Sequence, residues 1–125
     1  MRRYKELHTF EQRKMSSRQI TSKFPDRIPI IVEKSLHGGV LPELDKNKYL
    51  APHDMTVGQF MNVIKRRIKL NPTDALFLFV NDNVLPPTSS PLNILYKEHK
   101  DEDGFLYMII SSEATFGCAD ILHNN

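Results

Sequence analysis

Four short apolar segments, interrupted by a single strongly marked helix, limit the folds that this chain can adopt. Residues 28–34 and 48–51 precede the helix, and residues 75–80 and 105–110 follow it. The segments are mostly apolar and contain β-branched and aromatic residues, which is typical of strands. Pro52 closes the second segment, and because proline cannot donate to a neighbouring strand, it predicts that this strand lies at a sheet edge.

The helix between the two strand pairs has a start signal and a stop signal. Thr56 and Gln59 match a capping box, in which the two side chains bond backbone N–H groups that the first turn leaves free. The pair Asn71-Pro72 predicts its end, since proline disfavours helical backbone in the preceding residue. One stripe at helical spacing predicts the buried face: Val57, Met61, Ile64 and Ile68. Phe60 and Val63 lie on the flank and add more apolar surface than a core stripe requires.

The N-terminal segment is polar and basic. Residues 4–24 have helical spacing with one break and only a sparse apolar edge, so we expect helices attached to the core rather than inside it. Pro25 ends this segment. Residues 1–27 hold eight Lys or Arg against three carboxylates. This charge indicates either an acidic partner or anionic membrane surface, or an ordinary solvated helix face, and both interpretations stay open.

The order of the elements predicts an α+β fold. Two strands, a crossing helix and two more strands form the ubiquitin-like β-grasp, a four-stranded mixed sheet with a central helix, here with two N-terminal helices added. A ferredoxin-like fold is the rival, but it needs a second full helix before the last strand, and residues 92–96 are too short for one. We expect a helical segment at 1–24 packed on the core, the β-grasp at 25–112, a C-terminal arm at 113–117 and a tail at 118–125.

Length and composition exclude several classes of protein. A chain of 125 residues forms one domain with a single modest core. No apolar run approaches the ~20 residues that span a bilayer, and no apolar segment follows the basic start as in a secretory signal. One cysteine allows neither an internal disulfide nor a zinc site of paired cysteines, and it fits an intracellular, reducing location. We expect no metal and no cofactor.

Gly117 is the most informative residue near the C-terminus. It follows the last strand after a short polar arm, and six extended residues from Ser112 to Gly117 reach about 20 Å from the folded body. Such an arm suits a carboxyl terminus that is delivered into narrow active sites, and glycine has no Cβ to shield its carbonyl. Taken alone, the feature fits a frayed terminus better.

Several segments together resemble one known family. They are residues 23–34, 44–52, 56–60, 76–81, 86–88 and 101–107, with further matches at Tyr4-Lys5, His8 and Phe10-Glu11. This chain resembles the autophagy ubiquitin-like modifiers, the GABARAP and microtubule-associated light-chain proteins and their yeast relative, along nearly all of its length up to Gly117.

The resemblance implies a non-catalytic modifier that is made as a precursor. A dedicated cysteine protease would cut between Gly117 and Cys118, and activating and transferring enzymes would then join Gly117 to phosphatidylethanolamine. The protein would be cytoplasmic until lipidation and peripheral on autophagosomal membranes afterwards. Cys118 itself has no base arranged around it in the sequence, so we expect no enzymatic role for it.

The resemblance also implies a groove for receptor peptides. A peptide with an aromatic residue, two variable residues and an aliphatic residue would add a strand beside residues 48–51. Carried over by position, the aromatic pocket consists of Ile20, Pro29, Ile31, Lys48, Leu50 and Phe105. The aliphatic pocket consists of Tyr49, Pro52, Met55, Phe60, Val63 and Ile64, although spacing alone assigns Phe60 and Val63 to the core. Lys46, Lys48, Arg27 and Arg67 would face acidic residues that flank the motif.

Two other functions remain as alternatives. An unconjugated ubiquitin-like adaptor would bind peptides or tubulin through the same groove and the basic helices. A nucleic-acid-binding domain ranks far behind, because the chain lacks aromatic residues interleaved with its basic ones for stacking on bases.

Overall fold

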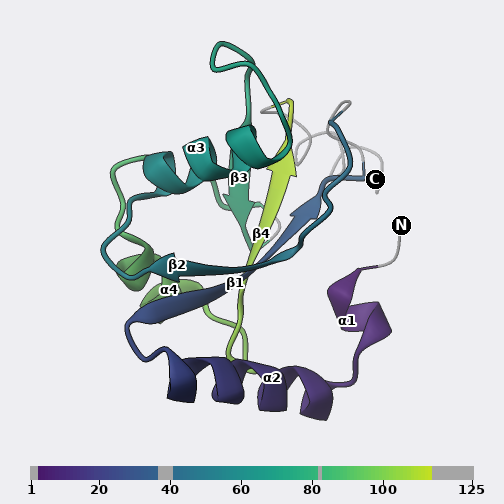
Figure 1. The fold of residues 1–125 in the computed structure, drawn as a ribbon, viewed down its shortest axis with the longest axis vertical. Helices are drawn as coiled ribbons and strands as arrows, with labels where there is room; N and C mark the ends of the chain where they lie inside the picture. Colours follow the sequence, from purple (N-terminus) through teal and green to yellow (C-terminus); the bar gives the residue numbers. More distant parts are fainter. Residues whose placement is uncertain (1–2, 37–40, 82, 114–125) are drawn as a thin grey trace.

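The structure is a computed structural model that describes residues 3–36, 41–81 and 83–113. Its elements follow the chain in this order: α1 (Tyr4–Leu7), α2 (Phe10–Lys23), β1 (Arg27–Lys34), β2 (Lys48–Pro52), α3 (Val57–Arg67), β3 (Phe77–Val80), α4 (Leu92–His99) and β4 (Leu106–Ser111). Helix α3 crosses one face of the sheet and α2 lies along the opposite face (Figure 1).

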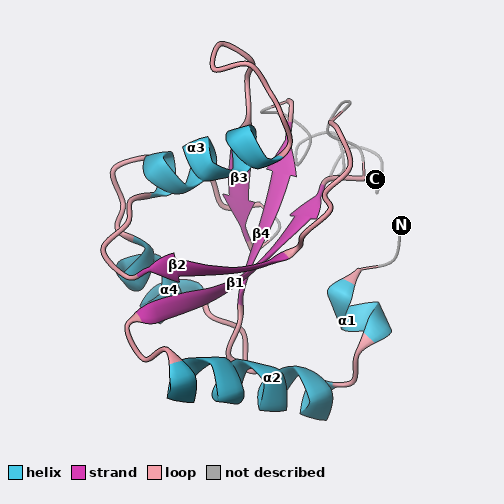
Figure 2. Ribbon diagram, viewed as in Figure 1, coloured by secondary structure: helices cyan, strands magenta, loops and turns pink. Residues whose placement is uncertain are grey.

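The four strands form one mixed sheet in the order β2-β1-β4-β3. The central pair, β1 and β4, is parallel, and each of these strands has an antiparallel neighbour on its other side (Figure 2). This is the expected α+β β-grasp arrangement. The prediction that residues 48–51 form an edge strand is confirmed, because β2 pairs only with β1 in the described sheet.

The main core fills the space between the sheet and α3. Ile28, Ile30 and Val32 alternate along β1 and turn their side chains into this core, as the period of two in a strand requires. Helix α3 contributes Val57, Phe60 and Ile64, each almost completely buried. Burying such a side chain stabilises the fold by about 1.5–3 kcal/mol, so this apolar layer holds the sheet and α3 together.

Helix α3 begins at the predicted capping box, but its buried residues and its last residue differ from the prediction. The capping box is present, with the Gln59 N–H donating to the Thr56 hydroxyl at 3.2 Å and the Thr56 N–H to the Gln59 amide oxygen at 2.9 Å. The predicted stripe is wrong at one position: Phe60 is 1% exposed and lies in the core, whereas Met61 is only partly buried. Both choices fit helical spacing, and burying the larger ring removes more apolar surface from water.

The end of α3 lies before the predicted stop. Arg67 is its last residue, and Lys69 adopts a positive φ of 61°, so the helix has ended before Asn71-Pro72 is reached. A residue with left-handed backbone cannot continue a right-handed helix.

Helix α4 is longer than the sequence predicted. It runs from Leu92 to His99 rather than over residues 92–96, so the length argument against a ferredoxin-like fold was wrong. The rival is excluded by connectivity instead. A ferredoxin-like unit begins strand, helix, strand, whereas here β1 and β2 follow one another and pair directly.

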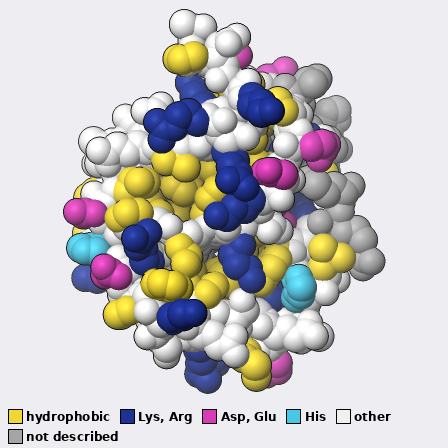
Figure 3. All heavy atoms as spheres, viewed as in Figure 1, with side chains coloured by type: hydrophobic (Ala, Val, Ile, Leu, Met, Phe, Trp, Pro, Cys, Tyr) yellow, Lys and Arg dark blue, Asp and Glu magenta, His cyan; other side chains and the backbone are white. Residues whose placement is uncertain are grey.

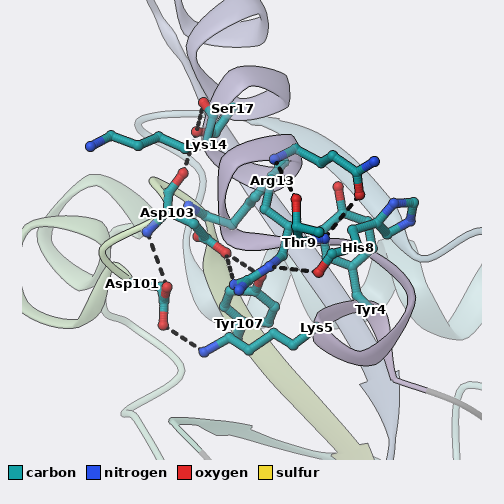
Figure 4. A network of polar contacts seen from close by, with 12 residues as sticks. Tyr4, Lys5, His8, Thr9, Arg13, Lys14, Ser17, Asp101, Asp103 and Tyr107 are labelled. Atoms are coloured by element: carbon teal, nitrogen blue, oxygen red, sulfur yellow. Dashed lines mark hydrogen bonds and ion pairs between the residues drawn. The ribbon is translucent and has the colours of Figure 1, made fainter.

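A fully buried carboxylate fixes α2 to the sheet. Asp103 accepts a hydrogen bond from the Arg13 guanidinium at 2.7 Å, one from the Phe105 N–H at 2.9 Å and one from the Tyr107 hydroxyl (Figure 4). Burial, together with Asp103, raises the pKa of Tyr107 well above its usual value, so its hydroxyl stays protonated and donates. The Ser17 hydroxyl also donates to the Asp103 carbonyl oxygen.

Two further contacts hold the segment that contains α1. The Tyr4 N–H donates to the Glu33 carboxylate at 2.8 Å, and its ring is only 5% exposed. The Lys5 ammonium lies 2.6 Å from the Asp101 carboxylate. The Arg3–Glu33 and Arg13–Asp103 ion pairs act in the same way. Several of the basic N-terminal residues therefore attach α1 and α2 to the β-grasp domain.

Gly104 lies where Ser17 of α2 packs against the segment before β4. Its φ is +94°, and a Cβ added there would lie 2.4 Å from the Ser17 hydroxyl oxygen. We predict that Gly104→Ala lowers the free energy of unfolding by at least about 1–2 kcal/mol, from the strained φ alone. The neighbouring exposed variant Glu102→Ala is the control, and chemical denaturation measures both. Equal stability of the two variants would show that neither the positive φ nor the approach of Ser17 constrains residue 104.

The Lys5–Asp101 contact predicts a pH-dependent contribution to stability. Partial burial by itself raises the pKa of Asp101, but hydrogen bonds from Lys5 and the Asp103 N–H outweigh it and hold that pKa below its usual value. Because the folded pKa is lowered, the contribution is present above the unfolded pKa of about 4 and is lost as the pH falls through the folded pKa.

Lys5→Ala should therefore lower the Tm at neutral pH by a small amount, since partly exposed pairs contribute about 0.2–1 kcal/mol. The difference from the parent chain should shrink as the pH is taken well below 4. Melting curves over this range measure the effect, with exposed Lys97→Ala on α4 as the control. A difference that does not change with pH would assign the effect of Lys5 to its packing over the Tyr107 ring at 4.6 Å.

Candidate peptide-binding groove

Strand β2 offers an unpaired backbone edge. On its inner side, Asn47 accepts from the Val32 N–H at 2.8 Å and the His53 N–H donates to the Asp26 carbonyl at 3.2 Å, so odd-numbered residues of this stretch bond β1. Because backbone groups alternate in direction along an antiparallel strand, those of Lys48 and Leu50 point away from β1. A further strand has two donors and two acceptors available there.

The predicted aromatic pocket lies on the α2 side of this edge. Ile31, Phe105 and Ile20 belong to one apolar cluster. Pro29 pairs with Leu50 in the register of the sheet, and Ile31 pairs with Lys48, so the remaining members lie beside that cluster on the same face. The structure thus brings all six predicted residues to one side of the sheet edge, but it buries three of them, Pro29, Ile31 and Phe105. Only Ile20, Lys48 and Leu50 are partly exposed there, so the prediction that all six line an open pocket is wrong.

Two residues that the pocket prediction did not include also lie at this pocket. The Tyr4 ring packs against Phe105 at 5.6 Å between ring centroids, and the Lys48 ammonium lies over both rings at 5.5 and 5.8 Å. The same ammonium donates to the Ser16 hydroxyl at 3.1 Å. The sequence indicated Tyr4 only through the family resemblance, although an aromatic residue in a polar segment favours burial. Nothing in local spacing indicated the Ser16 contact.

The predicted aliphatic pocket lies on the α3 side and is only partly open. Pro52, Met55 and Val63 line a surface hollow with a volume of about 450 Å³. Tyr49, Phe60 and Ile64 are buried beneath it, at 6%, 1% and 0% exposure. The expectation that Phe60 adds exposed apolar surface is therefore wrong, and this ring belongs to the core cluster below the hollow. Polar side chains complete the rim of the hollow: Asp54, Gln59, Asn62 and Arg66.

Cations lie around the aromatic cluster and the α3-side hollow. Figure 3 shows apolar side chains gathered in the middle of this face, with Lys and Arg side chains among them. Lys46 lies over the Tyr49 ring at 5.0 Å, and Arg67 contacts Asp45 at 3.3 Å, while Arg27 is exposed at the start of β1. Burial raises the pKa of the Tyr49 hydroxyl in spite of the nearby Arg67. The face as a whole favours acidic ligands.

The predicted cleavage and conjugation residues, Gly117 and Cys118, lie outside the described residues. The description ends at Glu113, two residues after β4. Within the described part of the chain, no helix is both long and apolar enough to cross a bilayer. Those same residues contain no cluster of three His, Cys, Asp or Glu suited to a metal ion.

The sequence and the fold match one family. The family model described as autophagy protein Atg8, ubiquitin like, matches residues 12–117. The chain belongs to the Atg8 family. Autophagy-related protein 8d of Arabidopsis thaliana is 52% identical over 114 residues, which cover 91% of this chain and 93% of that protein. Autophagy-related protein 8 of Mycosarcoma maydis is 54% identical over 114 residues, covering 91% and 95%.

A solved structure of the Atg8 family agrees with this fold. The crystal structure of Trypanosoma brucei ATG8 superimposes with a TM-score of 0.83 at 43% identity, and the match covers 89% of this chain and 94% of that one. The resemblance stated from the sequence and the ubiquitin-like fold class are confirmed. The chain is accordingly a ubiquitin-like protein of autophagy, and its match to the family extends to Gly117.

Proposed function

We propose that this Atg8-family chain is conjugated through Gly117 to phosphatidylethanolamine and recruits receptor peptides to the edge of β2. The observation that carries the peptide part is that the apolar cluster of Ile20, Ile31 and Phe105 and the α3-side hollow lie on opposite faces of one free strand edge. Successive side chains of an added strand point to opposite faces, so an aromatic and an aliphatic residue three positions apart also do. The spacing of the motif therefore fits an aromatic anchor on the α2 side and an aliphatic anchor in the α3-side hollow.

In the bound state, the peptide backbone would bond the outward N–H and C=O groups of Lys48 and Leu50. Its aromatic side chain would pack on the α2 side against the partly exposed Ile20 and Leu50, next to the buried cluster of Ile31 and Phe105. Its aliphatic side chain would enter the α3-side hollow, where Pro52, Met55 and Val63 are accessible. Acidic residues flanking the motif would face Lys46 and Lys48, and Arg67 and Arg27 beyond them.

The conjugation part rests on the extent of the family match and on the chemistry of glycine. The match ends at Gly117, and eight residues follow it. A processing cysteine protease would cut the Gly117–Cys118 bond, and the activating enzyme would adenylate the new carboxylate. The carbonyl would pass between enzyme thiols as a thioester until the lipid amine attacks it and the thiol leaves. Without a Cβ, Gly117 leaves that carbonyl open to attack.

Conjugation would change where the protein resides. One acyl chain gives marginal, reversible membrane binding, whereas the two chains of phosphatidylethanolamine hold firmly. The unconjugated protein would be cytoplasmic, and the conjugate would be peripheral on autophagosomal membranes. An unconjugated adaptor that binds peptides or tubulin is the second candidate, because the β2 groove does not itself require Gly117.

The groove predicts which substitutions weaken peptide binding. A peptide with an aromatic–x–x–aliphatic core and preceding acidic residues should bind at micromolar strength, about −8 kcal/mol. Leu50→Ala and Val63→Ala should each cost about 1–2 kcal/mol, since each removes apolar contact with one anchor. Val63 is preferred to Phe60, whose loss would also open the core.

Leu85→Ala is the matched control, because Leu85 is an exposed leucine in the loop after β3, which is the opposite edge of the sheet. Isothermal titration calorimetry measures all three variants. The groove assignment fails if Leu85→Ala weakens binding as much as Leu50→Ala does.

The C-terminal chemistry predicts the behaviour of Gly117→Ala. The added methyl group should block or greatly slow both the cut after residue 117 and the later transfer to lipid. Intact-mass measurement of the protein from cells reports both steps, and Asp120→Ala in the tail is the control that should be processed normally.

A shortened chain ending at Gly117 should need no protease but still require the activating and transferring enzymes. Wild-type levels of membrane puncta with Gly117→Ala would refute conjugation and favour the adaptor.

A further inference from the structure

Met55 forms part of the wall of the α3-side hollow, beside Pro52 and Val63. Its side chain is partly exposed and packs against the main core cluster. Its backbone is held on both sides, because the Met55 N–H donates to the Pro52 carbonyl at 3.1 Å and the Met55 carbonyl accepts from the Leu92 N–H at 2.8 Å. The thioether side chain is therefore accessible to small solutes and is kept at the surface on which an aliphatic anchor would pack.

The other methionines of the described chain lack this combination. Met108 is completely buried, and Met61 on α3 packs against the core without lining the hollow. Met15 is 63% exposed, but it belongs to α2 on the opposite face of the sheet (Figure 1). Among the described methionines, only Met55 is both accessible and part of the proposed binding surface.

We propose that Met55 is an oxidation site that controls peptide binding. A peroxide converts its thioether to a sulfoxide, and the altered hollow no longer accepts the aliphatic anchor well. The inference rests on the proposed function of the groove and goes beyond it, because it makes peptide binding depend on a reversible chemical change in the wall of the hollow.

The chemistry needs only hydrogen peroxide as a co-reactant. The thioether sulfur attacks one peroxide oxygen, the S–O bond forms as the O–O bond breaks, and the second oxygen leaves with both hydrogens as water. The sulfur loses two electrons and the peroxide gains them. The product is a polar sulfoxide in place of a flexible apolar side chain.

The sulfoxide disfavours the aliphatic anchor for a simple reason. The new oxygen accepts hydrogen bonds from water while the hollow is empty. An aliphatic side chain packed on it would remove that water and offer no donor in return, and an uncompensated polar group costs free energy. Reduction of the sulfoxide by methionine sulfoxide reductases restores the apolar wall.

The test compares peptide binding before and after treatment of the full chain with hydrogen peroxide. The probe is a labelled peptide with acidic residues before a Phe–x–x–Leu core and without Met or Cys, added after catalase has removed the peroxide. By fluorescence anisotropy, oxidation should raise the Kd of the parent chain about five- to tenfold. Met55→Leu keeps the volume and apolar character of the side chain, so its Kd should stay close to that of the untreated parent in both states.

Matched variants and repair identify the responsible sulfur. Met15→Leu and Met61→Leu make the same substitution elsewhere and should lose affinity on oxidation as the parent does. Cys118 is present in every variant, so its oxidation cannot account for a difference between them. Methionine sulfoxide reductases A and B together should restore the parent Kd, and peptide mapping by mass spectrometry reports which methionines carry oxygen.

A second peptide, with Ala in place of the Leu anchor, tests where the oxidation acts. It places no large side chain against Met55, so it should bind weakly and lose little further affinity. The inference is overturned, while the groove function stands, by any of these outcomes: an unchanged parent Kd, equal weakening of both peptides, loss of affinity in oxidised Met55→Leu, or no oxygen on Met55 when Met15 is oxidised. Failure of the untreated parent to bind the Leu peptide would instead overturn the groove function itself.

Discussion

The buried carboxylate of Asp103 is the interaction on which the binding face depends. Arg13 from α2, Tyr107 from β4 and the Phe105 backbone all donate to it, and it has no exposure to solvent. Removing one partner from a buried pair typically costs about 3–5 kcal/mol, because an uncompensated charge remains. Gly104, the next residue, has no side chain and leaves room for Ser17 of α2 beside it. A helix as polar as α2 has little apolar surface to hold it, so this polar network places it, and with it Ile20 and Ser16, against the sheet.

Once α2 is fixed, the edge strand divides the face into two chemically different halves. On the α2 side, buried rings and isoleucines lie under the Lys48 ammonium. On the α3 side, Met55 and Val63 line an open hollow above the core. The alternation of side chains in β2 alone produces this division, and it is also the alternation that an added peptide strand must follow. In the proposed complex, the sheet edge would supply affinity through the backbone, and the aromatic cluster and the α3-side hollow would supply selectivity.

Local rules predicted much of this arrangement, and long-range contacts account for most of what they missed. The capping box at Thr56, the edge position signalled by Pro52 and the order of the strands are local, and all three are confirmed. The choice between Phe60 and Met61 was wrong because both fit helical spacing and only tertiary packing decides. Helix α4 was predicted too short. Contacts of Ser16 with Lys48 and of Arg13 with Asp103 join residues far apart in sequence, and no local pattern predicts them. Gly117 was assigned from resemblance, and its role stays a prediction.

The central claim is that a peptide adds to β2 as a further strand, and amide hydrogen exchange tests it most directly. The amide protons of Lys48 and Leu50 point away from β1, whereas those of Tyr49 and Ala51 face it in the register of the sheet. When an aromatic–x–x–aliphatic peptide binds, exchange at Lys48 and Leu50 should slow markedly, while Tyr49 and Ala51, already protected, should change little. Unaltered exchange at Lys48 and Leu50 with saturating peptide, or new protection confined to Lys65 and Lys69 near the end of α3, would contradict the account.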